Sequence, residues 1–234
     1  MKTDYSFKLV AALILAGVFV ALFDTAHAAV PKAKRTRTRT GTYQDSNGNS
    51  GTLNSTVTRG DGEAVRNGTI TNQNGQTTTH TSDRTWNKAT GTGTVSSSTT
   101  TPDGDTMGRQ GTITKNTDGT VSSQGTFTGY TGKTSTYADT TSKTATGSST
   151  TGTITGPNGQ VSTVNSSFNK TAPGSTTRAT TVTGPTGKST EKEVSSKVNP
   201  DGTGTRVIET TKPDGTTSTR TETFTVTSSG PSGP

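Results

Sequence analysis

The sequence predicts an all-β repeat protein, a repetitive antiparallel β-meander of about 14 strands, with a parallel β-solenoid as the alternative. Three observations predict this fold class. Two interleaved series of glycines recur about every 28 residues, the segments between them alternate with period two, and the chain is too poor in apolar residues for a thick core.

Residues 1–28 are typical of a secretory signal peptide. Lys2 and Lys8 precede an apolar stretch over residues 9–23, and Ala26-His27-Ala28 resembles an export cleavage site. A stable bilayer span needs about 20 apolar residues, so we expect cleavage, with an uncleaved membrane anchor as the less favoured alternative. We therefore expect a protein without a membrane span, secreted to the cell surface or extracellular space, with the periplasm as a further location.

The composition after residue 28 excludes a thick hydrophobic core. Ala, Val, Ile, Leu, Met, Phe, Trp and Tyr account for 33 of these 206 residues, or 16%. Disorder and a thin repetitive β-structure both fit such a composition. The abundance of Thr, Ser and Gly, with scattered Val and Ile, favours strands. The chain has no Cys, so its rigidity has to come from backbone hydrogen bonds and packing.

The charge is concentrated at the start of the predicted mature chain. The formal net charge is +7, and five cations precede the first acid of the mature chain, Asp45. We expect residues 29–40 to form a flexible basic arm, residues 41–228 the Thr- and Gly-rich β-repeat domain, and residues 229–234 a flexible tail. A basic arm suits an anionic partner, although a solvated leader without a partner is an equal alternative.

The glycine repeat predicts thirteen chain reversals. Asn or Asp precedes most of these glycines, and Asn-Gly and Asp-Gly are strong signals for a turn between strands. Apolar residues flank several of the glycines at equal offsets, which predicts three-residue loops with glycine in the left-handed region. The predicted structural turn glycines are Gly48, Gly62, Gly75, Gly91, Gly104, Gly119, Gly132, Gly147, Gly159, Gly174, Gly187, Gly202 and Gly215.

The strands between these turns have two unlike faces. In the last strand, threonine occupies every second position from Thr217 to Thr227, while Arg220, Glu222 and Phe224 share the other face. One side of the sheet is thus predicted to be lined with threonine. The other side mixes aromatic, aliphatic and charged residues, and we expect the meander to curl so that its apolar-bearing faces meet.

A recurring cation favours the meander over the solenoid. A basic residue returns at steps of 27 to 29 residues, from Arg59 to Lys197. In a solenoid these cations would stack about 4.8 Å apart, which is unfavourable, whereas in a meander they lie about twice as far apart. This row and the arm form the predicted polyanion-binding set: Lys32, Lys34, Arg35, Arg37, Arg39, Arg59, Lys88, Lys115, Lys143, Lys170 and Lys197.

Catalytic and metal-binding patterns find little support in the sequence. His80 is the one histidine after the leader, and its place between Thr79 and Thr81 predicts an exposed strand residue. Most acidic residues lie at turns, where Asp has a backbone role, and no calcium-binding loop motif is present. We expect neither an enzyme nor a protein that depends on a metal or cofactor.

These observations favour a structural or adhesive protein of the cell surface or extracellular matrix. The expected partners are an anionic polysaccharide or lipopolysaccharide and a second copy of the chain, paired through an exposed edge strand. Nucleic acid is not an expected partner of an exported protein. The alternative is an ice-binding or carbohydrate-binding module that uses the threonine-lined strand faces.

Overall fold

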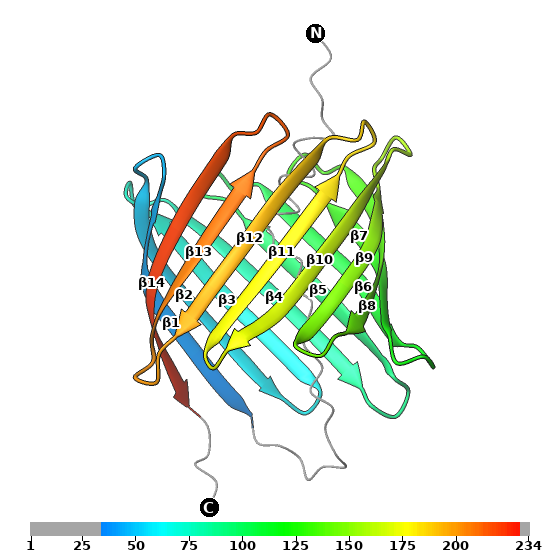
Figure 1. The fold of residues 1–234 in the computed structure, drawn as a ribbon, viewed down its shortest axis with the longest axis horizontal. Helices are drawn as coiled ribbons and strands as arrows, with labels where there is room; N and C mark the ends of the chain where they lie inside the picture. The colour runs from blue at the N-terminus through cyan, green and yellow to red at the C-terminus, as the bar shows by residue number, and fades with distance from the viewer. Residues whose placement is uncertain (1–33, 230–234) are drawn as a thin grey trace, which may run out of the picture.

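The computed structural model describes residues 34–229, which form a single closed β-barrel of fourteen antiparallel strands (Figure 1). Each strand is paired with the strands before and after it in the chain, and β1 is paired with β14. The strands are β1 Arg35–Asp45, β2 Ser50–Gly60, β3 Glu63–Asn72, β4 Thr77–Asn87, β5 Thr92–Thr100, β6 Thr106–Lys115, β7 Val121–Thr128, β8 Thr134–Lys143, β9 Gly147–Thr155, β10 Val161–Ala172, β11 Ser175–Thr183, β12 Ser189–Val198, β13 Thr203–Thr211 and β14 Thr217–Ser229.

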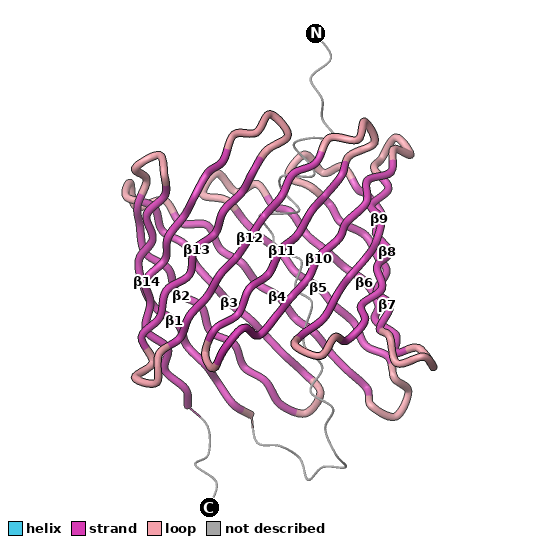
Figure 2. The backbone as a smooth tube through the Cα atoms, in the orientation of Figure 1, coloured by secondary structure: helices cyan, strands magenta, loops and turns pink. Residues whose placement is uncertain are grey.

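The predicted meander is confirmed, and the solenoid alternative is excluded. The curl expected from the apolar faces is complete, because β1 and β14 pair over their length, from Thr36 opposite Ser229 to Asp45 opposite Arg220. Closure joins the first and last strands and leaves no free sheet edge among the described strands. All strands tilt in the wall of the barrel, as Figure 2 shows.

The strand number sets the width of the barrel. Fourteen strands spaced about 4.8 Å apart and tilted about 40° would enclose a round barrel about 28 Å across between opposite backbones. Eight-stranded barrels are filled by their own side chains, and barrels of sixteen or more strands leave an aqueous channel. A fourteen-stranded barrel therefore has a lumen that long side chains can reach into from all sides.

The two faces predicted for each strand become the outer and inner walls of the barrel. On β14 the threonines face outward, while Arg220, Glu222 and Phe224 face the lumen, where Phe224 and Glu222 are buried. The buried apolar residues face the lumen as well: Leu53, Met107, Ile113, Phe127, Tyr137, Ile154, Val164, Val182 and Phe224. Many strands therefore contribute apolar side chains to the inner wall, although these side chains are too few to fill the lumen.

Inward glycines make room for inward aromatic rings on neighbouring strands. A Cβ on Gly51 of β2 would lie 2.7 Å from a ring carbon of Tyr43 on β1, which is its partner across the sheet. A Cβ on Gly111 of β6 would overlap the Tyr137 hydroxyl group, which reaches it across β7 from β8. The rings can lie on the sheet because these glycines have no side chain.

The seven turns at one end of the barrel, here called the uniform rim, share a single geometry. In each of these turns the glycine N–H donates to the carbonyl oxygen three residues earlier, as Gly48 does to Asp45 (3.1 Å). Gly119 makes the same contact with Asn116 (3.1 Å) in a turn of the other rim. These are the predicted three-residue loops with a left-handed glycine. The uniform rim consists of residues 46–48, 73–75, 102–104, 130–132, 157–159, 185–187 and 213–215.

The turns at the opposite end, here called the variable rim, differ from one another. Asp61-Gly62 is a two-residue turn with positive φ at both positions, and Gly174 follows Pro173 beside a bulge in β10. Twelve of the thirteen predicted turn glycines have positive φ, and Gly147 does not. Instead, Gly147 is the first residue of β9 and pairs with Asn169, so its assignment to a turn was wrong.

The predicted basic arm is only partly outside the barrel. Residues Arg35–Thr40 form the first half of β1, with β2 on one side and β14 on the other, so they are not a flexible arm. Arg and Thr alternate along this segment, and such alternation is typical of a strand. The prediction of an arm relied on the charge of the segment and not on this alternation. Residues 29–33 of the predicted arm and residues 230–234 of the predicted tail lie outside the described residues, as does the predicted signal peptide.

Candidate functional site: the cationic lumen

A belt of charged side chains lines the lumen near the middle of the barrel. Each of its members faces inward and lies within about three residues of the centre of its strand. Eight are cations and two are acids. The belt consists of Arg39, Arg66, Arg84, Arg109, Asp139, Arg178, Lys192, Arg206, Arg220 and Glu222.

The net charge of the belt equals the net charge of the described chain. Residues 34–229 contain 20 Lys and Arg and 14 Asp and Glu, a net charge of +6. The belt alone contains eight cations and two acids, which is also +6. The rest of the described chain therefore carries twelve cations and twelve acids and is neutral in sum. Six of these cations also lie on the inward face of their strands, nearer the variable rim: Arg35, Arg37, Arg59, Lys115, Lys143 and Lys170.

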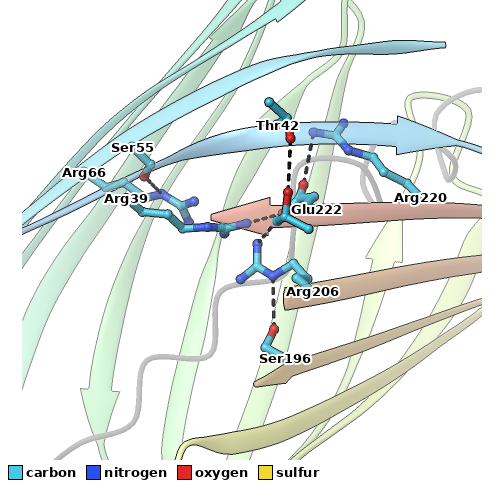
Figure 3. Close-up of polar contacts among 9 residues, drawn as sticks. Arg39, Thr42, Ser55, Arg66, Ser196, Arg206, Arg220 and Glu222 are labelled. Carbon is cyan, nitrogen blue, oxygen red and sulfur yellow. Dashed lines mark hydrogen bonds and ion pairs between the residues drawn. The ribbon is translucent and has the colours of Figure 1, made fainter. Parts of the chain in front are cut away.

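Glu222 is the carboxylate at the centre of one half of the belt (Figure 3). It is only 4% exposed and forms an ion pair with Arg39 across the β1–β14 junction. Arg220, two residues earlier on the same strand, places Nη2 3.0 Å from Oε1 of Glu222, and Nη1 of Arg206 lies 3.7 Å from Oε2. A single negative charge is thus shared by three guanidinium groups.

Serine hydroxyls on adjacent strands hold two of the arginines. Arg66 Nε donates to Ser55 Oγ at 3.1 Å, and Arg206 Nε donates to Ser196 Oγ at 3.1 Å (Figure 3). Ser55 and Ser196 face inward as well, so each contact joins neighbouring strands on the inner wall. The hydrogen bonds orient the guanidinium groups without neutralising them.

Three of the belt arginines stack closely on aromatic rings, and a fourth, Arg178, lies 5.5 Å from the ring centroid of Phe168. The guanidinium carbon lies 3.9 Å from the ring centroid for Arg39 over Phe224, and 4.0 Å for Arg220 over Tyr43. Arg109 lies 4.0 Å above the ring of Tyr137. Stacking on a ring limits the rotation of an arginine and is favourable for the charged form. The belt cations are therefore positioned before any ligand arrives.

The other half of the belt surrounds Asp139. Arg109 Nη2 lies 3.5 Å from Asp139 Oδ2 and donates to Ser123 Oγ at 3.2 Å. Burial raises the pKa of Asp139, while Arg109 and Arg84 oppose this rise. Burial, and next the charge of Arg109, lower the pKa of Arg84 to about 10. Two guanidinium groups thus face one carboxylate here, so this half also keeps an excess positive charge.

Burial, together with neighbouring cations, lowers the pKa of two further belt residues. Burial lowers the pKa of Lys192 to about 8, and the charges of Arg206 and Arg220 contribute to the shift. Burial and then the charge of Arg39 lower the pKa of Arg206 to about 10. These groups are held among like charges in a medium less polar than water. An anion in the lumen would relieve this repulsion.

His80 is not the exposed strand residue that its polar neighbours predicted. It faces the lumen from β4, half-buried, with Nδ1 2.9 Å from Thr99 Oγ1. Burial, and secondly the charge of Arg66, lower the pKa of His80, so it is neutral at pH 7. Across residues 34–229, no group of three or more His, Asp or Glu side chains is placed to hold a metal ion.

The predicted polyanion-binding residues gather mainly at the variable rim, at the lower end of the barrel in Figure 1. β1 begins there, and the even-numbered strands end there. Lys34 forms an ion pair with Glu63 at this rim, at 3.4 Å. The predicted residues that lie at the variable rim are Lys34, Arg35, Arg37, Arg59, Lys88, Lys115, Lys143 and Lys170.

Three residues of the predicted set lie elsewhere or outside the described chain. Arg39 belongs to the belt, Lys197 is exposed on the outer wall of β12, and Lys32 lies outside the described residues. Sequence reasoning missed the other nine belt residues. The sequence contained a clue to these residues, because charged residues such as Arg220 and Glu222 lie on the strand face that carries Phe224 and not on the threonine face.

The outer wall is polar, and its threonines pair across strands. Thr42 and Thr223 have their hydroxyl oxygens 3.1 Å apart, and Thr85 and Thr94 2.7 Å apart. No helix in the part of the chain that the structure describes is long and apolar enough to cross a membrane. No protein-family model matches the chain, and no curated protein has a detectably similar sequence.

Proposed function

We propose that the protein is an exported, non-enzymatic binding protein that holds a multiply charged anion in the lumen of its barrel. The observation that supports this proposal is the location of the charge. The belt carries a net charge of +6, equal to that of residues 34–229 as a whole, so the remaining described residues sum to zero. A charge excess concentrated inside a barrel is costly unless a counter-charge enters.

The side-chain chemistry supports oxyanions as the ligand class. Seven of the eight belt cations are arginines, whose planar guanidinium groups suit bidentate contacts with carboxylate, sulfate or phosphate groups. Stacking on Phe224, Tyr43 and Tyr137 preorganises three of them. Less side-chain entropy is then lost on binding, which favours affinity.

The variable rim supports an entry route for such a ligand. Eight cations of the predicted polyanion-binding set lie at this mouth, whereas the turns of the uniform rim contribute Lys133, Lys188 and Lys212. A positive mouth attracts polyanions and speeds association. The anionic polysaccharide or lipopolysaccharide expected from sequence therefore remains the proposed partner class, at the cell surface or in the extracellular space.

Self-association through an edge strand receives no support from the fold. That expectation needed an unpaired strand, and β1 and β14 pair with each other instead. The proposed role is consequently one of ligand binding. An adhesive role is still proposed in one form, because a barrel that binds polyanions would attach to an anionic matrix.

The experiment compares the lumen with the outer surface. Calorimetric titration of a sulfated heparin tetrasaccharide measures affinity for wild-type protein and for a lumen double variant, Arg66→Gln with Arg206→Gln. Loss of two charge-assisted contacts should weaken binding by about tenfold or more. The matched control, Lys188→Gln with Lys197→Gln, removes the same charge from exposed positions and should change affinity less than about threefold.

Two outcomes would contradict the lumen as the site. One is an equal loss of affinity in the lumen and control variants, which would indicate general electrostatic attraction. The other is binding that does not weaken as salt rises, since contacts between a polyanion and cations are screened by salt.

A second candidate function uses the outer wall. Threonine alternates outward along β14, and cross-strand hydroxyl pairs such as Thr42 with Thr223 form a regular polar surface. This arrangement favours the ice-binding or carbohydrate-binding alternative. Thermal hysteresis of the purified protein tests the ice-binding reading, and Thr223→Lys at the centre of the surface should abolish it. Freezing behaviour equal to that of a buffer control would end this candidate.

A further inference from the structure

The lumen contains a cavity of about 80 Å³ lined by residues of the consecutive strands β4 to β10. It lies away from Glu222, in the half of the belt that contains Asp139. Its apolar lining comes from Val95, Met107, Phe127, Ile154 and Val164. Most of these side chains are buried, which makes this the most apolar part of the inner wall.

Polar groups converge on the same cavity. Arg109, Asp139 and His80 line it together with the ring of Tyr137. Arg109 Nε is buried without a hydrogen-bond partner among the described residues, and so is the Tyr137 hydroxyl, although Tyr137 is only 8% exposed. Buried donors without partners are uncommon in folded proteins. An apolar cavity with a few convergent polar groups is the usual form of a small-molecule site.

The local charge distinguishes this cavity from the Glu222 half of the belt. Arg84 and Arg109 face Asp139, which leaves one positive charge in excess. The remaining belt residues contain six cations and one carboxylate, an excess of five. The cavity therefore suits an anion with a single charge and an apolar body, whereas the Glu222 half suits a ligand with several charges.

We propose that this cavity is a second, separate binding site, for a small aromatic carboxylate. The carboxylate would accept hydrogen bonds from the Arg109 guanidinium group, including the unpartnered Nε. The ring would lie against Met107, Phe127 and Val164, where apolar contact and ring–ring packing are both favourable. The site shares Arg109 and Asp139 with the belt, but it goes beyond the proposed polyanion function because it adds an apolar lining and takes a different class of ligand.

Benzoate is the probe, and its binding to the full chain is followed by calorimetry. Ser97 lines the cavity and faces inward, so Ser97→Phe should fill part of it and weaken benzoate binding by tenfold or more. Ser96→Phe places the same ring on the outer wall of the same strand and should leave binding unchanged. Arg109→Gln should also weaken benzoate binding tenfold or more. Acetate and benzyl alcohol, which lack the ring and the charge respectively, should bind more weakly than benzoate.

A second measurement uses wild-type protein alone, so it holds even if a variant fails to fold. Magnetisation transfer from the benzoate ring protons should reach the Met107 methyl group, which lines the cavity. Absence of this transfer, equal benzoate affinity in Ser97→Phe and wild type, or no benzoate binding would each overturn the proposal. The heparin tetrasaccharide titration separates the two functions. Tetrasaccharide binding without benzoate binding defeats the cavity alone, whereas benzoate binding without tetrasaccharide binding defeats only the polyanion function.

Discussion

The inner and outer walls of this barrel are made from the same strands, yet they differ in every property except backbone pairing. The outer wall is mainly threonine and serine, and the described residues outside the belt are neutral in sum. The inner wall has the aromatic rings, the buried aliphatic residues and the belt, whose net charge is +6.

The difference indicates which wall maintains the fold and which is specialised. Threonine is a good strand former that pairs across strands and tolerates water, so the outer wall stabilises the sheet without needing a partner. The inner wall contains like charges held close together, which oppose folding. Inward arginines that oppose folding, and that are nevertheless stacked and hydrogen-bonded in place, are the feature on which the proposed anion binding rests.

The largest expected effect follows from removing the central carboxylate. Glu222→Gln leaves Arg39, Arg206 and Arg220 without their shared counter-charge, which should lower the free energy of unfolding by about 3–5 kcal/mol. The control is Glu191→Gln on the outer wall of β12, which should change stability by less than about 0.5 kcal/mol. Denaturant unfolding followed by circular dichroism measures both. Equal effects would mean that the inner charges are no more coupled than the outer ones.

A smaller loss should follow from filling the space beneath an inner ring. Gly111→Val would overlap the Tyr137 hydroxyl and the Gln124 carbonyl oxygen, and overpacking of this kind costs about 1–3 kcal/mol. Gly108, on the same strand but outward, has as its nearest neighbour the Ser97 carbonyl oxygen, 3.3 Å from an added Cβ. Gly108→Val should therefore be tolerated better in thermal unfolding. A variant pair with the same melting temperature would contradict the close ring contact.

The pH dependence of binding should distinguish a belt lysine from a surface lysine. Because the pKa of Lys192 is lowered to about 8, the folded protein loses this positive charge between pH 7 and pH 9. Affinity for the heparin tetrasaccharide should fall severalfold over this range. Lys192→Met should remove that decline, and Lys188→Met should not. A decline that persists in Lys192→Met would assign it to another group.

The same shift has a consequence for stability in the absence of ligand. The unfolded chain keeps the Lys192 proton up to the ordinary pKa of 10.5, whereas the folded protein releases it near pH 8. The unfolded state therefore binds more protons between these values, and this group makes the folded state more stable as pH rises from about 8 to 10.5. The free energy of unfolding of Lys192→Met should lack this contribution.

The smallest effect is expected at the turns. Asp118 Oδ1 accepts hydrogen bonds from the Thr120 backbone N–H at 2.9 Å and from its hydroxyl at 2.7 Å, and these contacts lower the pKa of Asp118. Their stabilisation is present above the unfolded pKa and is lost as pH falls through the lower, folded value. Asp118→Ala should cause a slight fall in melting temperature at pH 7 and none at pH 2. A loss at pH 2 equal to that at pH 7 would exclude the carboxylate as its source.

The turns and strand faces were predictable because their causes are local. A left-handed glycine is a property of a few adjacent residues, and the glycine pattern placed twelve of the thirteen reversals correctly, eight of them at a glycine preceded by Asn or Asp. The alternation of residue types along the sequence placed Arg220, Glu222 and Phe224 on one face of β14, although it did not show that this face points inward. Gly147 was assigned to a turn from the 28-residue spacing of the glycines alone, because it is preceded by Thr146 and not by Asn or Asp.

The charged belt was not predictable, because it depends on which strands meet around the lumen. Arg39 and Glu222 are 183 residues apart in the chain and meet only because β1 pairs with β14. His80 looked exposed for the same reason, since its threonine neighbours face outward while it faces the lumen. The local sequence pattern shows that a residue shares a strand face with apolar groups. It does not show which charged residues of other strands will lie near that residue.

Alternation and turn chemistry are short-range properties, so the order of residues along the chain was enough to establish antiparallel hairpins with one threonine face. Closure is a long-range event that depends on accumulated twist and on the register between the first and last strands. It converted one face of an open sheet into the lining of a lumen. That step brought together charges that are distant in the chain and left a cation excess that only an anion can balance.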